Sequence, residues 1–350
     1  MQKQRQWKKI IAIVLLVCII IGFFIPVPYY ITKPGSADEL SSLVRVKGHE
    51  SEAQGSFSLV TIAMAKANIY TYGLAKFLPY HELEMESDVR YEDESDEEYN
   101  VRQMYMMNES KNNAIQVAYK AAGQKVEVKY DGIYVMSVKS SVPAAEYLHA
   151  GDLITAIDEK TFQSSNEFIA YVKSKKPGDI VRVNYVHEKK KREADIKLTK
   201  LDKKGTAGIG ITLVDDEKLT VEPKISIDSE KIGGPSAGLM FSLEIYSRFL
   251  ETDLTNGVKI AGTGTISASG EVGRIGGIDQ KVVAADKSGA KIFFAPNDTV
   301  TAEMKKADSK TKSNYEEAKE TAKAIDTNMK IVPVKTFQEA VSYLEKLKTK

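Results

Sequence analysis

The sequence predicts an α/β protein that also carries a mainly β module and one N-terminal transmembrane helix. Three observations predict this architecture. An uncharged apolar run covers Ile10–Ile25, β-rich alternation is concentrated in residues 125–200, and strand-like and helix-like segments alternate from about Gly205 to the end. Such alternation is typical of an α/β domain with a mixed sheet. A chain of 350 residues is long enough for two or three domains.

The composition is that of a globular protein and argues against several functions. The chain is 43% hydrophobic and 28% charged, with a net charge of +1. No basic stripe carries interleaved aromatic residues, which argues against a nucleic-acid partner. The single cysteine, Cys18, lies in the apolar run, so the rest of the chain has no disulfide, cysteine-based zinc site or cysteine nucleophile. The four histidines are His49, His81, His149 and His187. They form no HExxH pattern, which argues against a metal site built from histidines.

The N-terminal segment has the features of a membrane anchor. Four residues extend the apolar run to a spanning length of about 20 residues: Val27, Tyr29, Tyr30 and Ile31. Trp7 before the run and Tyr29 and Tyr30 after it resemble interfacial aromatic anchors.

The charges around this segment predict its orientation. Lys3, Arg5, Lys8 and Lys9 precede the run, so the positive-inside rule places the N-terminus in the cytoplasm. A cleaved signal peptide is the alternative, but the run is long and no A-x-A site follows closely. We therefore expect a single-pass protein of the cell membrane with extracytoplasmic domains.

Between the anchor and residue 125, the sequence predicts a linker, a strand and a long helix. A Pro-Gly pair within the polar stretch Thr32–Ser36 marks the linker. Ser56–Ala65 alternates and carries β-branched residues, which predicts a strand. The acidic segment EMESDVRYEDESDEEY is typical of a solvated loop or helix face. From Glu97 to about Ala122, apolar spacing predicts a helix that ends at a glycine.

Residues 125–200 differ in character from the rest of the chain. The β-rich run VEVKYDGIYVMSV precedes a small helix ending at Gly151-Asp152, a strand, a Ser-capped helix closed by Pro-Gly, and a hairpin with a charged tip. This order, and especially GIYVMSV followed by AGDLITAID, resembles a PDZ domain.

The PDZ resemblance implies a peptide-binding groove. PDZ domains bind an extended peptide by adding it as a strand between a strand edge and a helix. The resemblance places the strand edge at Gly132, Ile133 and Tyr134, with Phe168 on the facing helix. In the alternative interpretation, Gly132 is only a turn glycine and the module is a spacer.

The region after about Gly205 predicts alternating strands and helices. The strand-like segments are GIGITLV, LTVEPKISID, VKIAGTGTIS, AKIFFAPND and MKIVPVK. The helix-like segments are Ala237–Leu250, GGIDQKVVAADKSG, KSNYEEAKETAKAI and the Thr-capped TFQEAVSYLEKL. The sequence therefore predicts a mixed sheet with helices between its strands.

One serine in this region, Ser236 of KIGGPSAGLM, has two interpretations. Gly and Pro before a serine are typical of a helix start, where the serine is a cap. The same pattern suits a nucleophile, because bare backbone admits a substrate carbonyl and N–H groups at a helix start can face a developing oxyanion.

A nucleophilic serine needs a base, and Lys281 is the strongest candidate. No histidine follows His187, which lies at the charged hairpin tip. Lys281 lies in the first turn of a predicted helix and is followed by VVAA. Burial and the helix dipole lower the pKa of a lysine, which must fall by roughly three units, or about 4 kcal/mol, to act near pH 7. The alternative is a surface helix lysine.

The PSAG element at Pro235–Gly238, followed by TGTISASGEVGRIGGIDQKVVAA, resembles the Ser–Lys proteolytic domain of Lon proteases. The resemblance implies that Ser236 is the nucleophile, that Lys281 is its base, and that Thr263 hydrogen-bonds the lysine. Gly233 and Met240 depart from the family, which often has Asp and Thr at these positions.

The resemblance also implies a divided catalytic domain. MNESKNNAIQVA is similar to the family's helix ahead of the active site. We therefore expect a Lon-type protease domain in two parts, residues 38–124 and 201–350, with a PDZ domain at 125–200 between them. Residues 1–37 would form the cytoplasmic tip, the anchor and the linker.

The whole layout resembles the membrane-anchored, PDZ-containing Lon-like proteases of Gram-positive bacteria. It implies an ATP-independent serine endopeptidase that cleaves extracytoplasmic peptides or proteins with PDZ-assisted capture. No G-x-x-x-x-G-K-[ST] motif occurs, and GTGTISASGEVGRIGG lacks the strand–GxGxxG–helix context of a dinucleotide loop. No cofactor, metal or nucleotide is expected. The alternative is a catalytically silent scaffold whose PDZ groove binds partner tails; the substrate and the oligomeric state are left open.

Overall fold

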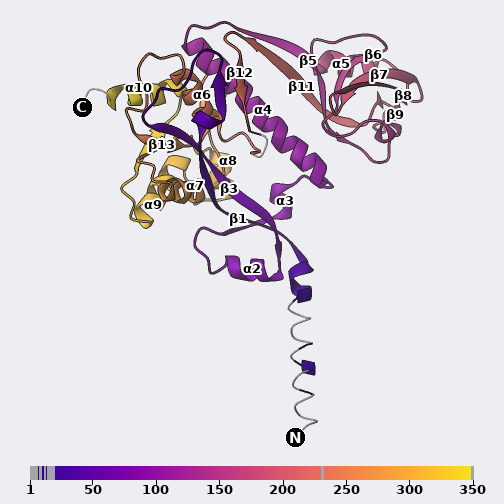
Figure 1. The fold of residues 1–350 in the computed structure, drawn as a ribbon. Helices are drawn as coiled ribbons and strands as arrows, with labels where there is room; N and C mark the ends of the chain where they lie inside the picture. The colour runs from indigo at the N-terminus through magenta and orange to yellow at the C-terminus, as the bar shows by residue number, and fades with distance from the viewer. Residues whose placement is uncertain (1–6, 8–9, 12, 14–19, 230–231, 348–350) are drawn as a thin grey trace.

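The chain folds into two bodies and an N-terminal extension (Figure 1). The structure is a computed structural model that describes Trp7, Ile10, Ile11, Ile13, residues 20–229 and residues 232–347. The larger body, the α/β domain, contains residues 26–121 and 222–347, and the smaller body, the β module, is formed by the segment between them.

The α/β domain is built on a six-stranded mixed sheet with the order β17-β16-β13-β3-β1-β4. The pairs from β17 to β3 are parallel, while β1 pairs antiparallel with both β3 and β4. The strands are β1 (Pro26–Glu39), β3 (Ser56–Asn68), β4 (Glu82–Met85), β13 (Lys259–Gly262), β16 (Ile292–Pro296) and β17 (Lys330–Val334). Because β3 precedes the β module and β13 follows it, the two flanking segments form one domain.

Helices cover both faces of this sheet. Neighbouring strand residues point to opposite faces. Phe294 therefore packs in a core with α4 (Asp96–Ala121), α6 (Gly238–Ser247) and α10 (Phe337–Leu347). Phe293 packs in a second core with α7 (Ile278–Lys287) and α9 (Asn314–Ala324). The predicted mixed α/β sheet is confirmed.

Shorter elements complete the α/β domain. Its short helices are α2 (Ile69–Ala75), α3 (Glu86–Val89), α8 (Ala302–Ala307) and the 3-10 turn η1 (Leu40–Ser42). Two strand pairs lie outside the main sheet: β2 (Val44–Val46) with β12 (Ile225–Ile227), and β14 (Thr265–Ile266) with β15 (Val272–Gly273). The sequence analysis predicted none of the short helices.

The long helix α4 starts and ends close to the predicted residues. Ser95 caps it, since its Oγ accepts a hydrogen bond from the backbone N–H of Glu98 while the Glu98 carboxylate accepts from the Ser95 N–H. Gly123 follows its end with φ of 71°, the left-handed conformation that glycine adopts without strain.

The β module is a five-stranded antiparallel sheet with the order β11-β5-β6-β7-β8. Its strands are β5 (Val126–Val138), β6 (Leu153–Ile157), β7 (Ile180–His187), β8 (Lys190–Lys197) and β11 (Ile211–Val221). The helix α5 (Ser165–Lys173), the 3-10 turn η2 (Pro143–Glu146) and the pair β9 (Thr199–Lys200) and β10 (Ala207–Gly208) complete the module. Apolar side chains from these elements form a separate core.

The sheet of the module gains a strand beyond residue 200, the module end expected from the sequence. β11 pairs with β5 over the whole of its length, from Ile211↔Val138 to Val221↔Val126. The two strands run out of the module towards the α/β domain as a two-stranded ribbon (Figure 1). A strand that pairs across such a distance in sequence carries no local signal of its partner, so the sequence assigned it to the following domain.

The predicted linker at Thr32–Ser36 is also wrong, because these residues lie in β1. The Pro-Gly pair sits at an irregularity in the pairing of β1 with β3, between Pro34 and Ala37. A Cβ on Gly35 would lie 2.4 Å from Thr61 Oγ1, so this glycine allows a close approach of the two strands.

The predicted anchor lies partly outside the described residues. Residues 20–24 are helical, but the chain becomes β1 at Pro26, so the four residues expected to lengthen the anchor belong to the sheet. Tyr30, expected at the membrane interface, is buried, with 5% of its surface exposed. Among the residues that the structure describes, no helix is long and apolar enough to cross a membrane.

Candidate active site

A groove of about 1340 Å³ crosses the α/β domain. Its walls come from β1, β3, the first half of α4 and the loop that leads into α6. Ser236 and Lys281 both line this groove, although 45 residues separate them in the chain. The groove therefore joins two of the residues that the sequence singled out.

Ser236 lies on a tight loop two residues before α6. Gly234 has φ of 83°, which lets the chain turn sharply ahead of Pro235. Ala237 is the N-cap of α6 and makes no side-chain capping bond. The interpretation of Ser236 as a helix cap is therefore wrong, and its hydroxyl is free for other partners.

Lys281 enters the groove from the first turn of α7, as predicted. The helix begins after Gly277, whose φ of 62° turns the chain into it. Lys281 Nζ lies 2.8 Å from Ser236 Oγ and 3.1 Å from Thr263 Oγ1, and donates a hydrogen bond to each. The structure thus brings together Ser236, Lys281 and Thr263.

The environment of Lys281 changes its protonation. Only 3% of its surface is exposed, and in the described part of the chain no carboxylate forms an ion pair with it. Burial without a counter-charge favours the neutral amine and lowers the pKa of Lys281 to about 7. Near neutral pH this lysine can therefore both accept and donate a proton.

Thr263 also fixes the loop that carries Ser236. Its Oγ1 donates to the Ser236 carbonyl at 3.0 Å, and the next residue, Gly264, donates its backbone N–H to the same carbonyl at 2.8 Å. Within the described residues, the backbone N–H groups of Ser236 and Ala237 donate no hydrogen bond. These groups lie beside the positive end of α6, where an anion is stabilised.

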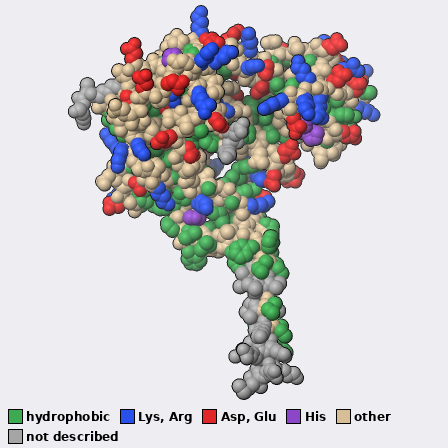
Figure 2. Space-filling view, in the orientation of Figure 1, with side chains coloured by type: hydrophobic (Ala, Val, Ile, Leu, Met, Phe, Trp, Pro, Cys, Tyr) green, Lys and Arg blue, Asp and Glu red, His purple; other side chains and the backbone are tan. Residues whose placement is uncertain are grey.

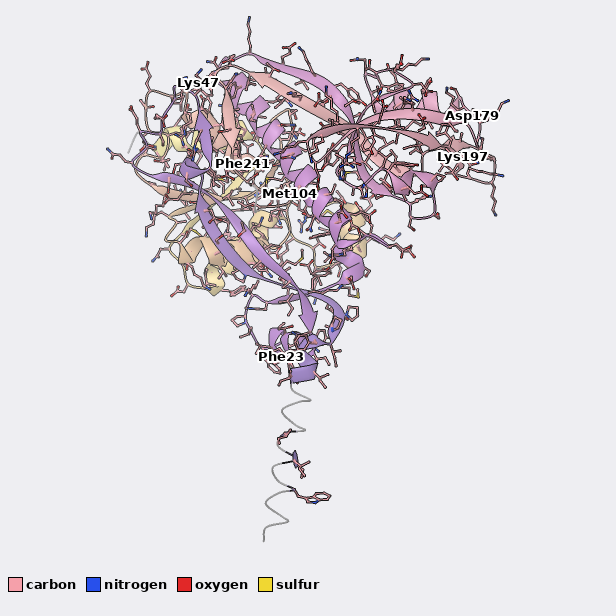
Figure 3. The ribbon with its side chains drawn as sticks, turned by 45° about the vertical axis from the view of Figure 1, so that its right-hand side comes forward. Phe23, Lys47, Met104, Asp179, Lys197 and Phe241 are labelled. Atoms are coloured by element: carbon pink, nitrogen blue, oxygen red, sulfur yellow. The ribbon has the colours of Figure 1, made fainter. Side chains whose placement is uncertain are left out.

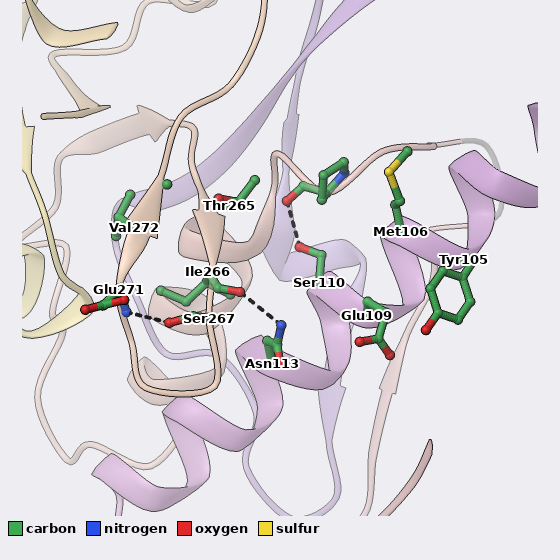
Figure 4. A pocket seen from close by; sticks show the side chains of 12 residues that line it. Tyr105, Met106, Glu109, Ser110, Asn113, Thr265, Ile266, Ser267, Glu271 and Val272 are labelled. Carbon is green, nitrogen blue, oxygen red and sulfur yellow. Dashed lines mark hydrogen bonds between the residues drawn. The ribbon is translucent and has the colours of Figure 1, made fainter. Parts of the chain in front are cut away.

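The helix α4 supports the same loop from the other side (Figure 4). Ser110 Oγ donates to the Pro235 carbonyl at 2.8 Å, and Asn113 Nδ2 donates to the Ile266 carbonyl at 3.1 Å. The Gly234 N–H donates to the carbonyl of Gln103, at 3.0 Å. These supports were not predicted, although the spacing of Ser110 and Asn113 on a predicted helix places both on one face.

A second hollow of about 500 Å³ lies behind the loop that carries Ser236 (Figure 4). Tyr105, Met106 and Glu109 of α4 form one wall, and Thr265 and Val272 of the β14–β15 pair form the other. Pro235 lines both this hollow and the groove. The hollow therefore adjoins the loop of Ser236 but does not contain its side chain.

The predicted peptide-binding residues do not form a free strand edge. Ile133 pairs with Ile154 of β6 on one side and with Asp215 of β11 on the other, so β5 is an inner strand. Gly132 and Tyr134 are paired on the β11 side as well. Phe168 packs inside the module core, with 2% of its surface exposed. The assignment of these residues to a peptide groove is wrong.

The edge next to α5 belongs to β11 instead. β11 is an outer strand of the sheet, and the Asp215 carboxylate accepts a hydrogen bond from the Ser165 N–H at the start of α5. Ile211 and Leu213 are half-buried against the module core. The segment GIGITLV that opens this strand was predicted as β structure, but nothing in its pattern marked it as the outer strand.

The other charged candidates lie away from the groove. His187, the alternative base, belongs to the β module, where its Nδ1 lies 2.7 Å from Asp152 Oδ1. Among the described residues, ligand atoms of His149, Asp152 and His187 lie within 4.8 Å of one another. Asp152 also accepts the backbone N–H of His149, so its carboxylate closes a loop of the module.

Comparisons with known proteins match both bodies. Residues 121–198 match the PDZ domain family, and residues 225–345 match the Lon protease (S16) C-terminal proteolytic domain. The chain contains a PDZ domain and a Lon-type proteolytic domain. The β module is therefore the PDZ domain, and the α/β domain contains the proteolytic domain.

The chain is also similar to curated Lon proteases of bacteria. Lon protease 2 of Bacillus subtilis is 36% identical over 110 residues, which are 31% of this chain and 16% of that protein. Lon protease of Campylobacter jejuni is 29% identical over 140 residues, 36% of this chain and 16% of that protein. The chain thus spans about a sixth of the length of these relatives.

Two solved structures that are similar to this chain are PDZ domains from Listeria. The PDZ domain of the SdrC-like protein from Listeria monocytogenes is 67% identical and covers 25% of this chain and 93% of that chain, with a TM-score of 0.25. The corresponding domain from Listeria innocua is 63% identical over 24% of this chain and 93% of that chain, with a TM-score of 0.23.

Proposed function

We propose that this protein is a membrane-anchored, ATP-independent serine endopeptidase in which Ser236 is the nucleophile and Lys281 its base. One observation supports the proposal most strongly: the buried Lys281 amine, whose pKa is lowered to about 7, lies 2.8 Å from the Ser236 hydroxyl. A neutral amine at this distance can take the hydroxyl proton. The Lon-type domain indicates the reaction class, which is peptide-bond hydrolysis.

The reaction follows from this geometry. Lys281 Nζ accepts the proton of Ser236 Oγ while the oxygen attacks the scissile carbonyl carbon. The oxyanion that forms is stabilised by the N–H groups at the start of α6. The Lys281 ammonium then gives its proton to the leaving amine, which frees the amine product and leaves an acyl group on Ser236. Neutral Lys281 next activates a water molecule that hydrolyses the ester.

Thr263 is a positioning residue in this scheme. Its hydroxyl accepts a hydrogen bond from Lys281 Nζ and donates one to the Ser236 carbonyl, so it fixes the amine relative to the nucleophile loop. The amine then spends little time in orientations that cannot reach Ser236 Oγ.

The groove suits an extended substrate. β13 pairs with β3 from Ser56 to Leu59, and the next part of β3, from Val60 to Met64, lines the groove beside Ser236. In the described structure no strand pairs with that stretch of β3 on the β13 side. A peptide lying there in extended form can add to the strand through its backbone.

The PDZ domain would capture the substrate before cleavage. The free edge of β11 beside α5 is the place where an extended segment can add as a strand. Capture at this edge raises the effective concentration of the scissile segment at Ser236. The sequence has no Walker-type motif for ATP-driven unfolding of substrates. The enzyme would therefore select segments that are already extended, which is the form that the groove accepts.

The membrane anchor is proposed from the apolar run and the basic residues before it. By the positive-inside rule, these features favour a cytoplasmic N-terminus, with both domains outside the cytoplasm. The layout of anchor, PDZ domain and Lon-type domain, as in the proteases of Gram-positive bacteria that the sequence resembles, supports the same orientation.

Cleavage by the purified full-length protein tests the catalytic assignment. In detergent and without nucleotide, the protein should cleave an unfolded protein substrate, and a fluorophosphonate probe should label it covalently. Ser236→Ala should lose both activities, whereas Ser247→Ala, at the far end of the same helix, should keep both. Equal cleavage by the two variants would remove Ser236 from the mechanism.

The second candidate, a silent scaffold, predicts a different result. The wild-type protein would bind peptides at β11 but would neither cleave a substrate nor react with the probe. The close contact between Ser236 and Lys281 argues against this candidate, because a scaffold has no need of a buried amine beside a serine hydroxyl.

A further inference from the structure

Exposed apolar side chains gather at the base of the α/β domain, around α2 and the chain that follows it. Figure 2 shows hydrophobic side chains concentrated at this end of the molecule, where the N-terminal extension leaves it. We call these residues the basal patch: Ile69, Tyr70, Leu74, Phe77, Leu78 and Met85. Phe77 is 84% exposed and Leu74 is 56% exposed, so the patch has no cover within the described chain.

The basal patch is continuous with the end of the N-terminal helix. The rings of Phe23 and Tyr70 lie 4.7 Å apart, and those of Tyr29 and Tyr72 lie 5.0 Å apart. A Cβ on Gly22 would lie 2.5 Å from Tyr70 Oη, so α2 packs directly against the backbone there. The patch therefore surrounds the point at which the apolar run enters the domain (Figure 3).

The length of the apolar run indicates what covers the patch. Ile10–Ile25 contains 16 residues, which in a helix reach about 24 Å. The hydrocarbon core of a bilayer is about 30 Å thick, so this run alone is several ångströms short. Because β1 starts at Pro26, the run cannot be lengthened at this end, and the basal patch supplies apolar surface at that depth.

The polar residues around the patch fit a membrane interface. Tyr72 lies in α2 and Tyr80 in the chain that follows it. Lys76 Nζ lies 4.5 Å from the centre of the Tyr72 ring. Tyrosine and long-stemmed lysine are the side chains that occupy the headgroup layer. Both signs of charge flank the patch, as in the ion pair of Lys66 and Glu86, so anionic lipid is not required.

We propose that the basal patch inserts into the interfacial layer of the lipid bilayer and forms a second membrane contact beside the N-terminal helix. The proposal rests on the membrane anchor of the proposed function, but not on its catalytic chemistry. Burial of apolar side chains provides the binding energy, so the contact forms equally well with zwitterionic lipid.

Depth-dependent quenching tests the proposal on the full-length protein. Cys18→Ser removes the single cysteine, and Phe77→Cys then carries an environment-sensitive fluorophore; Lys47→Cys, exposed at the opposite end of the domain, is the matched control (Figure 3). In phosphatidylcholine vesicles, lipids with a doxyl group on the acyl chain should quench the label at 77 several-fold more than the label at 47. Phosphatidylglycerol or 0.5 M salt should not change the ratio by more than about twofold.

The possible failures are distinguishable. Equal quenching at 77 and 47 in protein that floats with the vesicles would overturn the basal patch proposal and leave the anchor intact. A blue-shifted label at 77 that lipid does not quench, and that responds to protein density, would assign the patch to a second copy instead. Protein that does not float with vesicles would overturn both the patch and the anchor, while probe labelling of Ser236 reports separately on catalysis.

Discussion

Lys281 is almost completely buried, and burial lowers the affinity of its amine for a proton. A pKa lowered from 10.5 to about 7 makes the neutral form abundant in the physiological range. Each unit of this change corresponds to about 1.4 kcal/mol of differential stability of the two protonation states. Burial, rather than a charged partner, thus gives Lys281 the protonation that the proposed base requires.

We expect cleavage to follow the deprotonation of Lys281. The rate should rise with pH through about 7 and level off above about 8, because only the neutral amine can take the Ser236 proton. Lys281→Arg should be inactive at every pH, since arginine stays protonated. Measuring kcat/KM for a short peptide from pH 5.5 to 9.5 checks both points.

A second group with a pKa of about 7 could produce the same pH profile, so a control variant is needed. Desolvation and the nearby Asp279 carboxylate raise the pKa of Glu82 to about 7, although the residue is exposed at the surface; it belongs to β4, outside the lining of the groove. Glu82→Gln should therefore leave the midpoint of the profile unchanged. A midpoint that moves in Glu82→Gln, or substantial activity in Lys281→Arg, would contradict the role of Lys281.

The same lysine should make folding stability depend on pH. Its folded pKa of about 7 lies below its ordinary value, so between pH 7 and about 10.5 the unfolded chain binds a proton that the folded chain does not. Stability therefore rises with pH across this window, by up to about 5 kcal/mol. Urea unfolding followed by circular dichroism should show this rise in the wild type and a smaller one in Lys281→Met. Parallel curves for the two proteins would contradict it.

The contact between Ser236 and Lys281 could be predicted from the sequence, but the hydrogen bonds that support it could not. PSAG and the segment around Lys281 are contiguous motifs, and the lysine's apolar neighbours in the chain already indicated burial. The hydrogen bonds from Ser110 and Asn113 join segments more than 100 residues apart. Polar residues on a helix face have many destinations, and only the packing of α4 against α6 selects this one.

At the scale of single elements, α4 supports the loop that carries Ser236. Ser110→Ala should leave the Pro235 carbonyl without its partner and let the loop of Ser236 drift. The loss of one such bond costs about 1 kcal/mol, so kcat should fall about fivefold with little change in KM. Steady-state kinetics on a short peptide check this.

A neighbouring substitution provides the control for this prediction. Glu109→Gln changes the adjacent residue of α4, which lines the second hollow and not the groove, and should keep the wild-type kcat. Ser110→Thr should restore most of the rate because it retains a hydroxyl. If the three variants are equally slow, the effect belongs to α4 as a whole rather than to the Pro235 bond.

The helix α6 is tied to the N-terminal part of the domain by a buried ion pair. Arg248 lies 2.6 Å from Glu244 on the same helix, and both side chains are 4% exposed. The Arg248 guanidinium also donates to the carbonyls of Ser41 and Val44. These bonds join a segment before the PDZ domain to one after it.

Removing one member of this pair should be costly. Arg248→Ala leaves Glu244 buried without a partner, and its pKa is already raised by burial. We expect a loss of about 3 kcal/mol in the free energy of unfolding. Urea unfolding of Arg248→Ala and of the double variant Glu244→Gln/Arg248→Met separates the two contributions. The double variant should be more stable than the single one, and equal stability would contradict the argument from an unpaired charge.

Some elements could not be predicted from the sequence, and the physical reasons can be identified. The Pro34-Gly35 pair has the local pattern of a linker, yet β3 pairs with β1 on either side of it and confines the irregularity to a few residues. The helix α2 is short and exposes most of its apolar residues, so it lacks the one-sided pattern that marks a helix packed on a core.

At the scale of the whole molecule, the ribbon of β5 and β11 joins two domains by two chain crossings. Tyr105 of α4 contacts the PDZ domain as well: its ring lies 5.4 Å from that of Tyr134, and its hydroxyl donates to the Asp215 carbonyl. These contacts restrict the orientation of the PDZ edge relative to the groove. In the proposed capture role, the PDZ domain would therefore present substrate in a limited set of directions.

Excising the PDZ domain should separate capture from chemistry. Tyr130 and Glu217 are paired across the ribbon, so replacing residues 131–216 by Asn-Gly closes the ribbon as a two-residue hairpin. We expect KM for a long unfolded substrate to rise about tenfold or more, while kcat/KM for a short peptide changes less than about threefold. Circular dichroism must first show that the variant is folded. Equal losses for both substrates would remove the recruitment role.

The paired strands β1 and β3 affect which peptide bonds of a membrane-tethered substrate can reach Ser236. Both strands run from the groove down to the basal patch, and from Val60 to Ile69 the chain advances nine residues, which is up to about 30 Å. With the patch in the bilayer, the paired strands β1 and β3 would hold Ser236 and Lys281 at a fixed height above the membrane. A polypeptide that is itself tethered to the same membrane must then extend roughly nine residues from the lipid before its backbone reaches Ser236, and bonds nearer to the bilayer are spared. Cleavage sites in tethered substrates should therefore be selected by their height above the membrane as well as by their sequence.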